Sequence, residues 1–355
     1  MSRAVNNAFR LARKSPGGPT SVLPSLSCSA RPTLPTQAVH HGASTPSRAS
    51  SHSPLGPSTT TRKKITLPTL QAMHRRHDPI TMLTAHDFPS AHAADTSGME
   101  VILVGDSLAM VALGLPNTNS VTLEDMLLHC RSVMRGAQAA FVVGDLPMGS
   151  YELDARQATE SAIRMVKEGG VHGVKLEGGV DVVEQIRGVT RAGIPVLAHV
   201  GLTPQRSSAL GGFRVQGKNV AGAMKVLRDA LAVQGAGAWG VVLEAVPAEV
   251  AALVTKKLRI PTIGIGAGAG CSGQVLVQVD MIGNYPPGRF LPKFVKRFGD
   301  VWGETTRAIA AYREEVKGGS YPADEHTYPM PKEEFAEFEK VVDDISRTVG
   351  SDEKQ

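Results

Sequence analysis

Acidic residues are absent from the first 77 positions of this 355-residue chain, and the first one is Asp78. Eleven of the 38 Lys and Arg residues precede that position, so residues 78–355 carry 27 basic and 33 acidic residues, a formal charge of −6. The overall charge of +5 therefore reflects a basic leader attached to an acidic body. Nucleic-acid binding needs a basic surface, so we expect no nucleic acid as a partner.

Long hydrophobic runs and paired cysteines are also missing. No uninterrupted apolar run reaches the ~18 residues of a membrane-spanning helix, so no membrane partner is expected. Cys28, Cys130 and Cys271 are far apart and have neither CxxC nor metal-ligand spacing, so disulfide bonds are not expected. With 42% hydrophobic and 20% charged residues, the composition is that of a globular protein with enough apolar material for a core.

Residues 1–62 are rich in Ser, Thr, Pro and Arg. Near the start, in AVNNAFRLARK, apolar residues follow the i, i+3, i+4, i+7 spacing of one helix face and basic residues fall on the opposite side. This composition is typical of a mitochondrial transit peptide and predicts a disordered, mitochondrial-targeting leader. The alternative is a disordered basic tail without a targeting role. A secretory signal is disfavoured because an apolar central region is lacking.

Short β-branched apolar runs alternate with longer amphipathic stretches from Ile80 onward. The eight runs are 80–85, 101–106, 139–147, 173–178, 195–201, 239–245, 261–268 and 275–283. Helices are expected at 88–97, 122–135, 154–169, 180–192, 220–236 and 247–258. Runs without polar alternation indicate strands covered on both faces, and helices between them imply parallel connections. We therefore predict an α/β fold, a (β/α)₈ TIM barrel over residues 63–300; a doubly wound open sheet is the alternative.

Polar residues at the carboxyl ends of the apolar runs favour the barrel over the open sheet. They are Asp106, Asp145, Lys175, Glu177, His199 and Glu244. In a barrel these ends converge on one mouth, so residues far apart in sequence can share a site. Residues 301–355, with helices expected near 303–316 and 332–348, form a predicted C-terminal helical extension that packs outside the barrel or against a neighbouring subunit.

Asp106 and Asp145 each follow a buried strand directly. A single Asp at such a position is more often a helix cap or a loop tie than a metal ligand. Two of them, joined by Glu177, favour a hard divalent cation that is held by carboxylate oxygens and water. Mg²⁺ is expected rather than Zn²⁺, because no cluster of His and Cys ligands is available.

Lys175 and Glu177 lie two residues apart on one strand, so their side chains point the same way. Lys175 either binds the carboxylate of an anionic substrate or is neutralised by Glu177. Glu244 has apolar neighbours in the sequence. It is either a candidate general base, with a pKa that desolvation would raise, or an inward acid paired with Lys or Arg. His199 is a candidate hydrogen-bond donor to substrate, or a satisfied core histidine.

Two further segments carry weaker signals. The Gly-rich stretch 207–219 contains Arg214 and Lys218, and either forms a mobile lid over an acidic ligand or is an ordinary solvated loop. GIGAGAG at 264–270 lacks the GxGxxG spacing and the opening βαβ position of a dinucleotide site, so it indicates nucleotide binding only weakly.

Nine segments together resemble one known family. They are TMLTAHD, EVILVGDSLAMVALG, DLPMGSY, VKLEGG, HVGLTPQ, GGFRVQGK, VLEAVP, PTIGIGAG and YPADEHTY. In this order, across roughly residues 65–328, they are similar to the ketopantoate hydroxymethyltransferases of pantothenate biosynthesis. One departure is visible, because the family usually has Tyr where this chain has His86.

The resemblance implies a barrel of the phosphoenolpyruvate mutase and isocitrate lyase kind. It implies that Asp106, Asp145 and Glu177 hold Mg²⁺, that Ser107 and Lys175 contact the 2-oxo acid substrate, and that Glu244 accepts the proton. Enzymes of this family commonly assemble as decamers, homo-oligomers of two pentameric rings held together in part by their C-terminal segments.

The resemblance also implies the reaction. A Mg²⁺-stabilised enolate of 3-methyl-2-oxobutanoate attacks the methylene unit of the co-substrate 5,10-methylenetetrahydrofolate, and water then releases 2-dehydropantoate and tetrahydrofolate. A Mg²⁺-dependent 2-oxo acid lyase or mutase on the same barrel, which does not depend on folate, is the alternative enzyme. A non-catalytic binding barrel is the alternative from another class.

Overall fold

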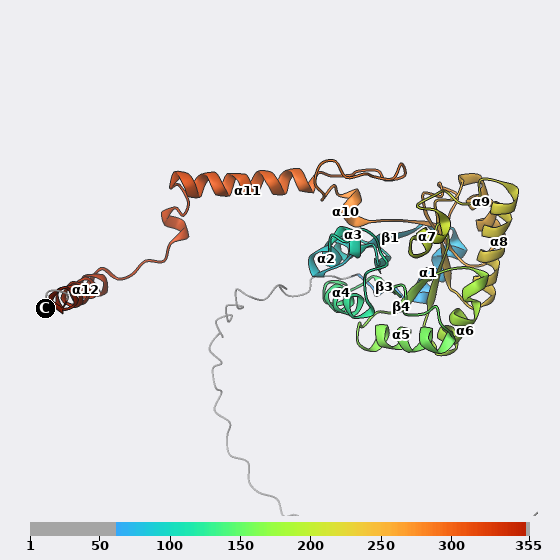
Figure 1. Cartoon of the computed structure of the whole chain (residues 1–355), viewed down its shortest axis with the longest axis horizontal. Coiled ribbons are helices and arrows are strands. Elements are labelled where there is room, and N and C mark those ends of the chain that lie inside the picture. Colours follow the sequence, from blue (N-terminus) through green and yellow to red (C-terminus); the bar gives the residue numbers. More distant parts are fainter. Residues whose placement is uncertain (1–61, 353–355) are drawn as a thin grey trace, which may run out of the picture. The chain divides into compact units, whose positions relative to one another are not determined.

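Eight parallel strands form a closed barrel in which each strand pairs with its neighbours in sequence order (Figure 1). This structure is a computed structural model that describes residues 62–352; residues 1–61, which hold nearly all of the predicted leader, lie outside it. The strands are β1 Ile80–Thr84, β2 Val101–Val104, β3 Phe141–Asp145, β4 Gly173–Glu177, β5 Val196–Gly201, β6 Gly240–Glu244, β7 Thr262–Ile265 and β8 Gly273–Leu276. Because β1 also pairs with β8, the predicted barrel is confirmed and the open sheet is excluded.

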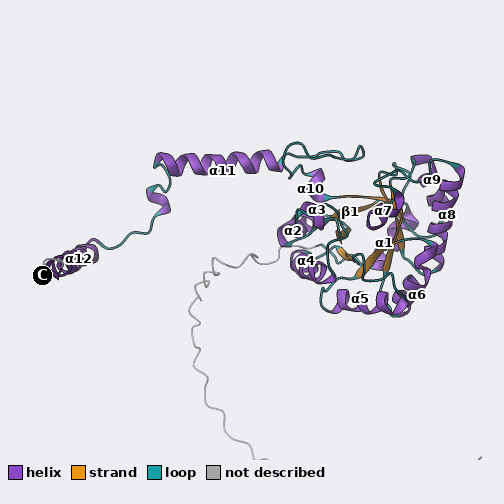
Figure 2. Ribbon diagram, in the orientation of Figure 1, coloured by secondary structure: helices purple, strands orange, loops and turns teal. Residues whose placement is uncertain are grey.

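Helices surround the ring of strands (Figure 2). The main ones are α2 Phe88–Thr96, α4 Leu123–Gly136, α5 Ala155–Lys167, α6 Val183–Arg191, α8 Val220–Gly235 and α9 Ala248–Lys257. Single-turn helices α3 Leu108–Val111, α7 Ser207–Leu210 and α10 Gln278–Met281 lie in the loops, with 3₁₀ turns at Val180–Val182, Pro204–Arg206 and Asp324–His326. The six helices expected from the sequence pattern are confirmed within three residues at each end.

The alternation of side chains along each strand divides the core in two. Inward-facing residues such as Leu103, Val143 and Leu197 form a cluster inside the barrel. Their strand neighbours, such as Ile102 and Val142, pack in a larger cluster with the surrounding helices. Because successive side chains on a strand point to opposite faces, every second residue of a strand must project into the barrel.

Helix α1, Leu67–Arg76, precedes the barrel and was not expected from the sequence pattern. Its Leu70 is fully buried and packs in the cluster inside the barrel, with residues that begin strands, such as Ile80. The N–H of Ile65 donates to the carbonyl of Ala139 (2.7 Å), which ties the segment before α1 to the residues that lead into β3. The helix therefore closes the amino end of the barrel, and any opening to solvent lies at the other end.

The eighth strand was predicted at 275–283, and both of these bounds were wrong. β8 starts at Gly273, where a Cβ would lie 2.3 Å from the carbonyl oxygen of Ile80, so only glycine lets the two strands come this close. It ends at Leu276, after which the N–H of Gln278 donates to Thr84 Oγ1 (3.0 Å) and α10 begins. The apolar run in the sequence continues past the end of β8 because the residues of α10 that follow are themselves partly buried.

The connection between β7 and β8 contains no helix, although eight complete βα repeats were expected. Residues 266–272 pass close to α9 instead: a Cβ on Gly268 would lie 2.5 Å from Ala248 Cβ, and one on Gly270 would lie 2.6 Å from Ala252 Cβ. The extended chain itself thus occupies the surface beside α9 where a helix would otherwise pack.

Helices α11, Val301–Gly318, and α12, Lys332–Asp352, confirm the expected C-terminal helical extension. No residue of α11 is buried. Apolar side chains of α12 are also exposed, among them Phe335, Phe338 and Ile345. Among the helices that the structure describes, none is both long enough and apolar enough to cross a membrane.

His172, before β4, is predicted to make stability depend on pH. Val142 N–H donates to its Nδ1 (2.8 Å), and burial, with a smaller effect from the charge of Lys64, lowers its pKa to about 4. The unfolded chain therefore binds this proton more readily than the folded protein, so stability is complete above about pH 6.5 and is lost as the pH falls towards 4. Melting temperatures at pH 7.5 and pH 5 should differ less in His172→Gln than in the unsubstituted protein.

A matched control is His92→Gln, which replaces an exposed histidine of α2 and should leave the difference between the two melting temperatures unchanged. Equal differences in all three proteins would contradict the assignment to His172.

Candidate active site

The polar residues predicted at the strand ends meet inside the carboxyl end of the barrel, which we call the mouth. On β3, the inward positions Phe141 and Val143 are followed by Asp145. The same alternation carries Lys175 and Glu177 inward on β4, His199 on β5 and, one strand further, Glu244 on β6. All six residues expected to share a site are linked by the contacts below.

Lys175 lies nearest to Asp145. Its Nζ is 2.9 Å from Asp145 Oδ1 and 3.8 Å from Glu177 Oε1, and all three side chains are at most 5% exposed. Asp145 and Lys175 are also direct partners in the register of β3 and β4. The charge of Lys175 is therefore shared between two carboxylates, with the closer contact to the neighbouring strand.

His199 bridges two acids. Its Nδ1 lies 3.3 Å from Glu177 Oε1 and its Nε2 lies 3.2 Å from Glu244 Oε2. Glu244 is the most exposed of these side chains, at 16%, so the carboxylate borders the open mouth on one side and His199 on the other. The inward acid Glu244 therefore has His199 as its partner, not the Lys or Arg of the alternative interpretation, and His199 is part of the charged cluster.

Asp106 joins the cluster through Asp145. The N–H of Asp106 donates to Asp145 Oδ2 (3.0 Å), so Asp145 does act partly as a loop tie. Ser107 follows at the start of α3, half buried, and its hydroxyl does not cap that helix. Asp106 itself is 5% exposed and does not cap a helix. Its carboxylate is therefore held next to that of Asp145 in the interior.

The proton affinities show an excess of buried negative charge. Burial, reinforced by Asp145, raises the pKa of Asp106 to about 8. Burial also raises the pKa of Asp145, although Lys175 opposes this. Burial and Lys175 oppose a charge on His199, but Glu177 and Glu244 outweigh them and raise its pKa to about 9. At neutral pH the neighbouring acids therefore favour the protonated, charged form of His199. A further cation placed among these acids would be stabilised by them in the same way.

Gln205 and Tyr151 were missed as members of the site. Gln205 Nε2 donates to Asp106 Oδ2 (2.9 Å), and the N–H of Gln205 donates to Glu177 Oε2 (3.1 Å). The hydroxyl of Tyr151 donates to Gln205 Oε1 (2.6 Å). Both side chains are almost completely buried. Gln205 stands four residues beyond β5 and Tyr151 six beyond β3, in the segments HVGLTPQ and DLPMGSY, but only the fold shows that both point back to the acids.

The other segments singled out in the sequence lie around the mouth. The N–H of Gln216, in the stretch 207–219, donates to the carbonyl of Ala245 next to Glu244 (2.8 Å). The Gly-rich residues 264–270 cover the end of β7 and the turn that follows it. His86 Nε2 lies 3.7 Å from Asp87 Oδ2, where Asp87 caps α2.

The acidic side chains of the cluster offer the oxygen ligands that Mg²⁺ prefers. Among residues 62–352, no group of three or more His, Cys, Asp or Glu side chains is arranged so that it could hold a metal ion. Two carboxylate oxygens of the cluster, Asp145 Oδ1 and Glu177 Oε1, are nevertheless buried, and their contacts are ion pairs with Lys175 and His199. Mg²⁺ is usually held by one or two carboxylates and keeps several waters for substrate oxygens, so these residues fit the ion.

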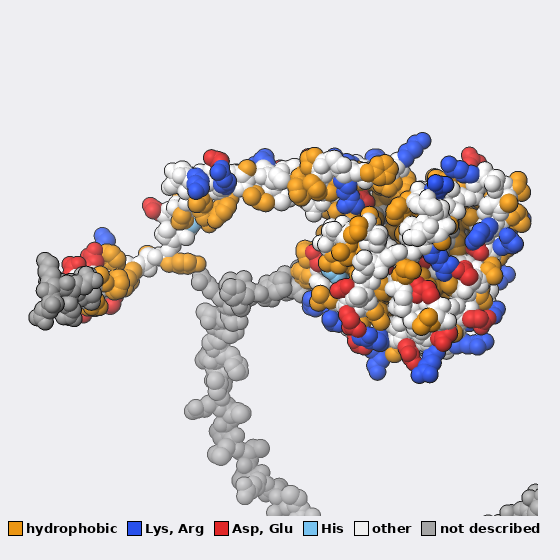
Figure 3. Space-filling model, in the orientation of Figure 1, with side chains coloured by type: hydrophobic (Ala, Val, Ile, Leu, Met, Phe, Trp, Pro, Cys, Tyr) orange, Lys and Arg blue, Asp and Glu red, His pale blue; other side chains and the backbone are white. Residues whose placement is uncertain are grey.

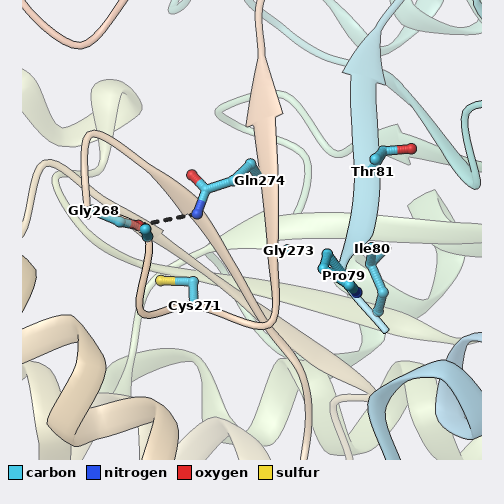
Figure 4. A pocket seen from close by; sticks show the side chains of 8 residues that line it. Pro79, Ile80, Thr81, Gly268, Cys271, Gly273 and Gln274 are labelled. Carbon is cyan, nitrogen blue, oxygen red and sulfur yellow. Dashed lines mark hydrogen bonds between the residues drawn. The ribbon is translucent and has the colours of Figure 1, made fainter. Parts of the chain in front are cut away.

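A pocket elsewhere on the barrel is not part of this site. It is lined by residues at the amino ends of β1 and β8, such as Thr81 and Gln274, and by the β7–β8 connection (Figure 4). Gln274 Nε2 donates to the carbonyl of Gly268 across it (3.0 Å). At the mouth, by contrast, the paired side chains of the charged cluster occupy the space between the strand ends.

A buried cation among carboxylates at the mouth of a (β/α)₈ barrel defines an enzyme site. A family model described as ketopantoate hydroxymethyltransferase matches residues 64–324, and the chain belongs to this family. It is 65% identical over 299 residues to 3-methyl-2-oxobutanoate hydroxymethyltransferase of Emericella nidulans, which covers 84% of this chain and 86% of that protein. The protein is thus an enzyme of the hydroxymethyltransferase class.

Similar proteins occur in other organisms, both as sequences and as solved structures. A protein named 3-methyl-2-oxobutanoate hydroxymethyltransferase 2, mitochondrial, from Oryza sativa subsp. japonica is 51% identical over 268 residues, or 75% of this chain and 67% of that protein. Among solved structures, phosphoenolpyruvate phosphomutase from Streptomyces platensis is similar over 80% of this chain and 99% of that chain, at 14% identity and a TM-score of 0.49.

Gln205→Met is predicted to weaken the site while leaving the barrel folded. The substitution keeps the length of the side chain but removes its hydrogen bonds to Asp106 and Tyr151. Bonds to charged groups contribute about 1.5–3 kcal/mol, so kcat/KM should fall by about 10-fold to 100-fold. Gln185→Met, at a buried position of α6, is the matched control and should change kcat/KM less than about twofold. Equal effects of the two substitutions would contradict a role for Gln205 in the site.

Proposed function

We propose that the enzyme transfers a hydroxymethyl group from 5,10-methylenetetrahydrofolate to 3-methyl-2-oxobutanoate, giving 2-dehydropantoate and tetrahydrofolate, as a step of pantothenate and coenzyme A biosynthesis. The single observation that carries this proposal is the pairing of Glu244 with His199 beside the buried Lys175. A carboxylate at the open mouth can take a proton from carbon, and an adjacent buried cation can balance an anionic 2-oxo acid.

Each side chain has a distinct role in the proposed reaction. Lys175 balances the carboxylate of the 2-oxo acid, and the Ser107 hydroxyl donates a hydrogen bond to it. His199 holds Glu244 in place through its Nε2, and it shares the hydrogen of that nitrogen with the substrate when the substrate binds. Glu244 then accepts the C3 proton, and the resulting carbanion attacks the methylene carbon of the folate as one of its two carbon–nitrogen bonds breaks and that nitrogen takes up a proton. Water then replaces the second nitrogen, so that its hydroxyl stays on the new hydroxymethyl group and its proton goes to the departing nitrogen of tetrahydrofolate.

The metal is part of the proposal. Asp106, Asp145 and Glu177 are the residues that would hold Mg²⁺, with Asp106 and Asp145 also close to the bound substrate. The crowding of these buried acids, which raises the pKa of Asp106, supports this assignment. When bound, the ion would supply Lewis-acid chemistry at the 2-oxo group. A Mg²⁺-dependent 2-oxo acid lyase or mutase could use the same residues, and dependence of turnover on folate separates the two.

We further propose that two segments of the chain have different roles. Residues 63–300 form the catalytic barrel, and residues 301–355 contact other copies in a homo-oligomer, which the family resemblance suggests to be a decamer. The exposed apolar residues Phe335, Phe338 and Val341 of α12 support this role, since they recur at the i, i+3, i+6 spacing of one helix face.

The predicted leader makes the enzyme mitochondrial in this proposal. The name of the related rice protein, which includes the word mitochondrial, and the acid-free composition of residues 1–62 support it. A fluorescent reporter fused behind residues 1–62 should accumulate in mitochondria. The same fusion with the basic residues of the leader changed to Gln should remain cytosolic, because targeting helices need a basic face. Cytosolic signal from the unsubstituted leader would contradict the assignment.

Glu244→Gln tests the proposed chemistry directly. The protein without residues 1–61, supplied with Mg²⁺ and both substrates, should form 2-dehydropantoate, and the substitution should lower kcat by about 10²-fold to 10⁴-fold because it removes the proton acceptor. Exchange of the C3 hydrogen of 3-methyl-2-oxobutanoate for deuterium, followed by NMR without folate, should be lost in parallel.

Glu249→Gln, which alters an exposed acid in the first turn of α9, is the matched control and should behave like the unsubstituted enzyme. Failure of the unsubstituted enzyme to form 2-dehydropantoate would overturn the proposed function. Full activity of Glu244→Gln would overturn the role of this residue alone.

A further inference from the structure

One loop near the mouth carries charge of a single sign. Residues 284–298, between α10 and α11, contain four basic residues and no Asp or Glu, and we call them the basic loop. Its basic residues are Arg289, Lys293, Lys296 and Arg297. Elsewhere on the visible face of the barrel, basic and acidic side chains are interspersed (Figure 3). A segment with only positive charge therefore stands out in a body whose formal charge is negative.

Both ends of the basic loop are fixed at the same place. The N–H of Phe298 donates to the carbonyl of Met281 (2.7 Å), and those of Val301 and Trp302 donate to Ile282 and Gly283. Residues 281–283 comprise the last residue of α10 and the two that follow it, shortly after β8 at the carboxyl end of the barrel. The segment is thus a closed Ω-type loop that begins and ends beside the mouth.

The middle of the basic loop contacts the strand next to the proposed base. The ring of Phe294 packs against Gly266, where a Cβ would lie 2.6 Å from Phe294 Cδ1. Gly266 follows Ile265, the partner of Glu244 in the register of β6 and β7, and its φ of +63° favours glycine. The basic loop therefore lies at the edge of the mouth, on the Glu244 side.

Two of the four charges serve the structure of the loop. Arg289 pairs with the buried Asp280 (3.1 Å) and Arg297 pairs with Asp300 (2.7 Å). Lys293 and Lys296 are exposed, and neither has a carboxylate partner among the described residues. Lys296 Nζ lies 4.9 Å from the centre of the Phe298 ring. Two cations on an anchored loop are thus available to an anionic ligand.

We propose that the basic loop binds the anionic poly-γ-glutamyl tail of the folate co-substrate, with Lys293 and Lys296 pairing with its carboxylates. This inference rests on the proposed function and assigns part of its co-substrate site. The methylene carbon of the folate must reach the carbon that Glu244 deprotonates, so the tail leaves the mouth nearby. Each added glutamate brings one more carboxylate, which matches the unpaired charges of the loop.

The test compares 5,10-methylenetetrahydrofolate carrying one glutamate with the same compound carrying five. At low ionic strength the unsubstituted enzyme should have a KM about tenfold lower for the pentaglutamate, because two exposed charge contacts add modestly to binding. Added salt should remove this preference. In Lys293→Ala/Lys296→Ala the two KM values should become equal, while kcat and the KM for the 2-oxo acid change less than about twofold.

Lys256→Ala/Lys257→Ala, at two exposed positions in the last turn of α9, is the matched control and should keep the tenfold preference. Two results would overturn the inference: no preference in the unsubstituted enzyme, or an unchanged preference in Lys293→Ala/Lys296→Ala. In both cases turnover of the monoglutamate would leave the proposed function standing, whereas its absence would count against that function.

Light scattering tests whether another copy of the chain, rather than the folate tail, binds the basic loop. If Lys293→Ala/Lys296→Ala lowered the molar mass of the assembly and kept the glutamate preference, the basic loop would belong to a contact between copies of the chain. That outcome would also overturn the inference. An unchanged mass together with a lost preference supports it.

Discussion

Closure of the barrel is the constraint on which the rest of the structure depends. Once eight parallel strands close, every second side chain points into a space that α1 seals at one end. Apolar residues such as Val143, Leu197 and Val242 fill that space below the carboxyl ends of the strands. The inward positions nearest the mouth on β3 to β6 hold the polar residues Asp145, Lys175, Glu177, His199 and Glu244. Polar groups at these positions have no route to solvent except the mouth, so they must find partners in one another.

The pairing of buried charges then shapes the chemistry. An isolated buried ion costs several kcal/mol, which is why Lys175 lies between Asp145 and Glu177 and why His199 lies between Glu177 and Glu244. The carboxylates still outnumber the cations, and this imbalance makes the site receptive to a divalent cation. In the proposed function the same imbalance would link a divalent cation, the anionic substrate and Glu244 in one cluster, so that none of them could change without affecting the others.

The hydrophobic pattern of the sequence predicted most strands and helices correctly, but it did not predict where the chain departs from a regular βα repeat. Apolar runs located all eight strands because parallel strands are covered on both faces. Yet β8 begins early because Gly273 permits close approach to β1, and the β7–β8 connection lacks a helix because its own backbone packs on α9. Helix α1 was missed because it lies before the repeating pattern. Each exception depends on a contact with a segment distant in sequence, which a local pattern does not contain.

The sequence by itself determined the basic leader, the barrel and the set of charged residues at the strand ends, since strand periodicity and the family motifs are local properties. Only the tertiary structure decided the partners: Asp145 for Lys175, His199 for Glu244, and Gln205 as the link between Asp106 and Glu177. It also brought the basic loop to the edge of the mouth. The physical reason is that strand register and loop closure, not separation along the chain, set which side chains meet.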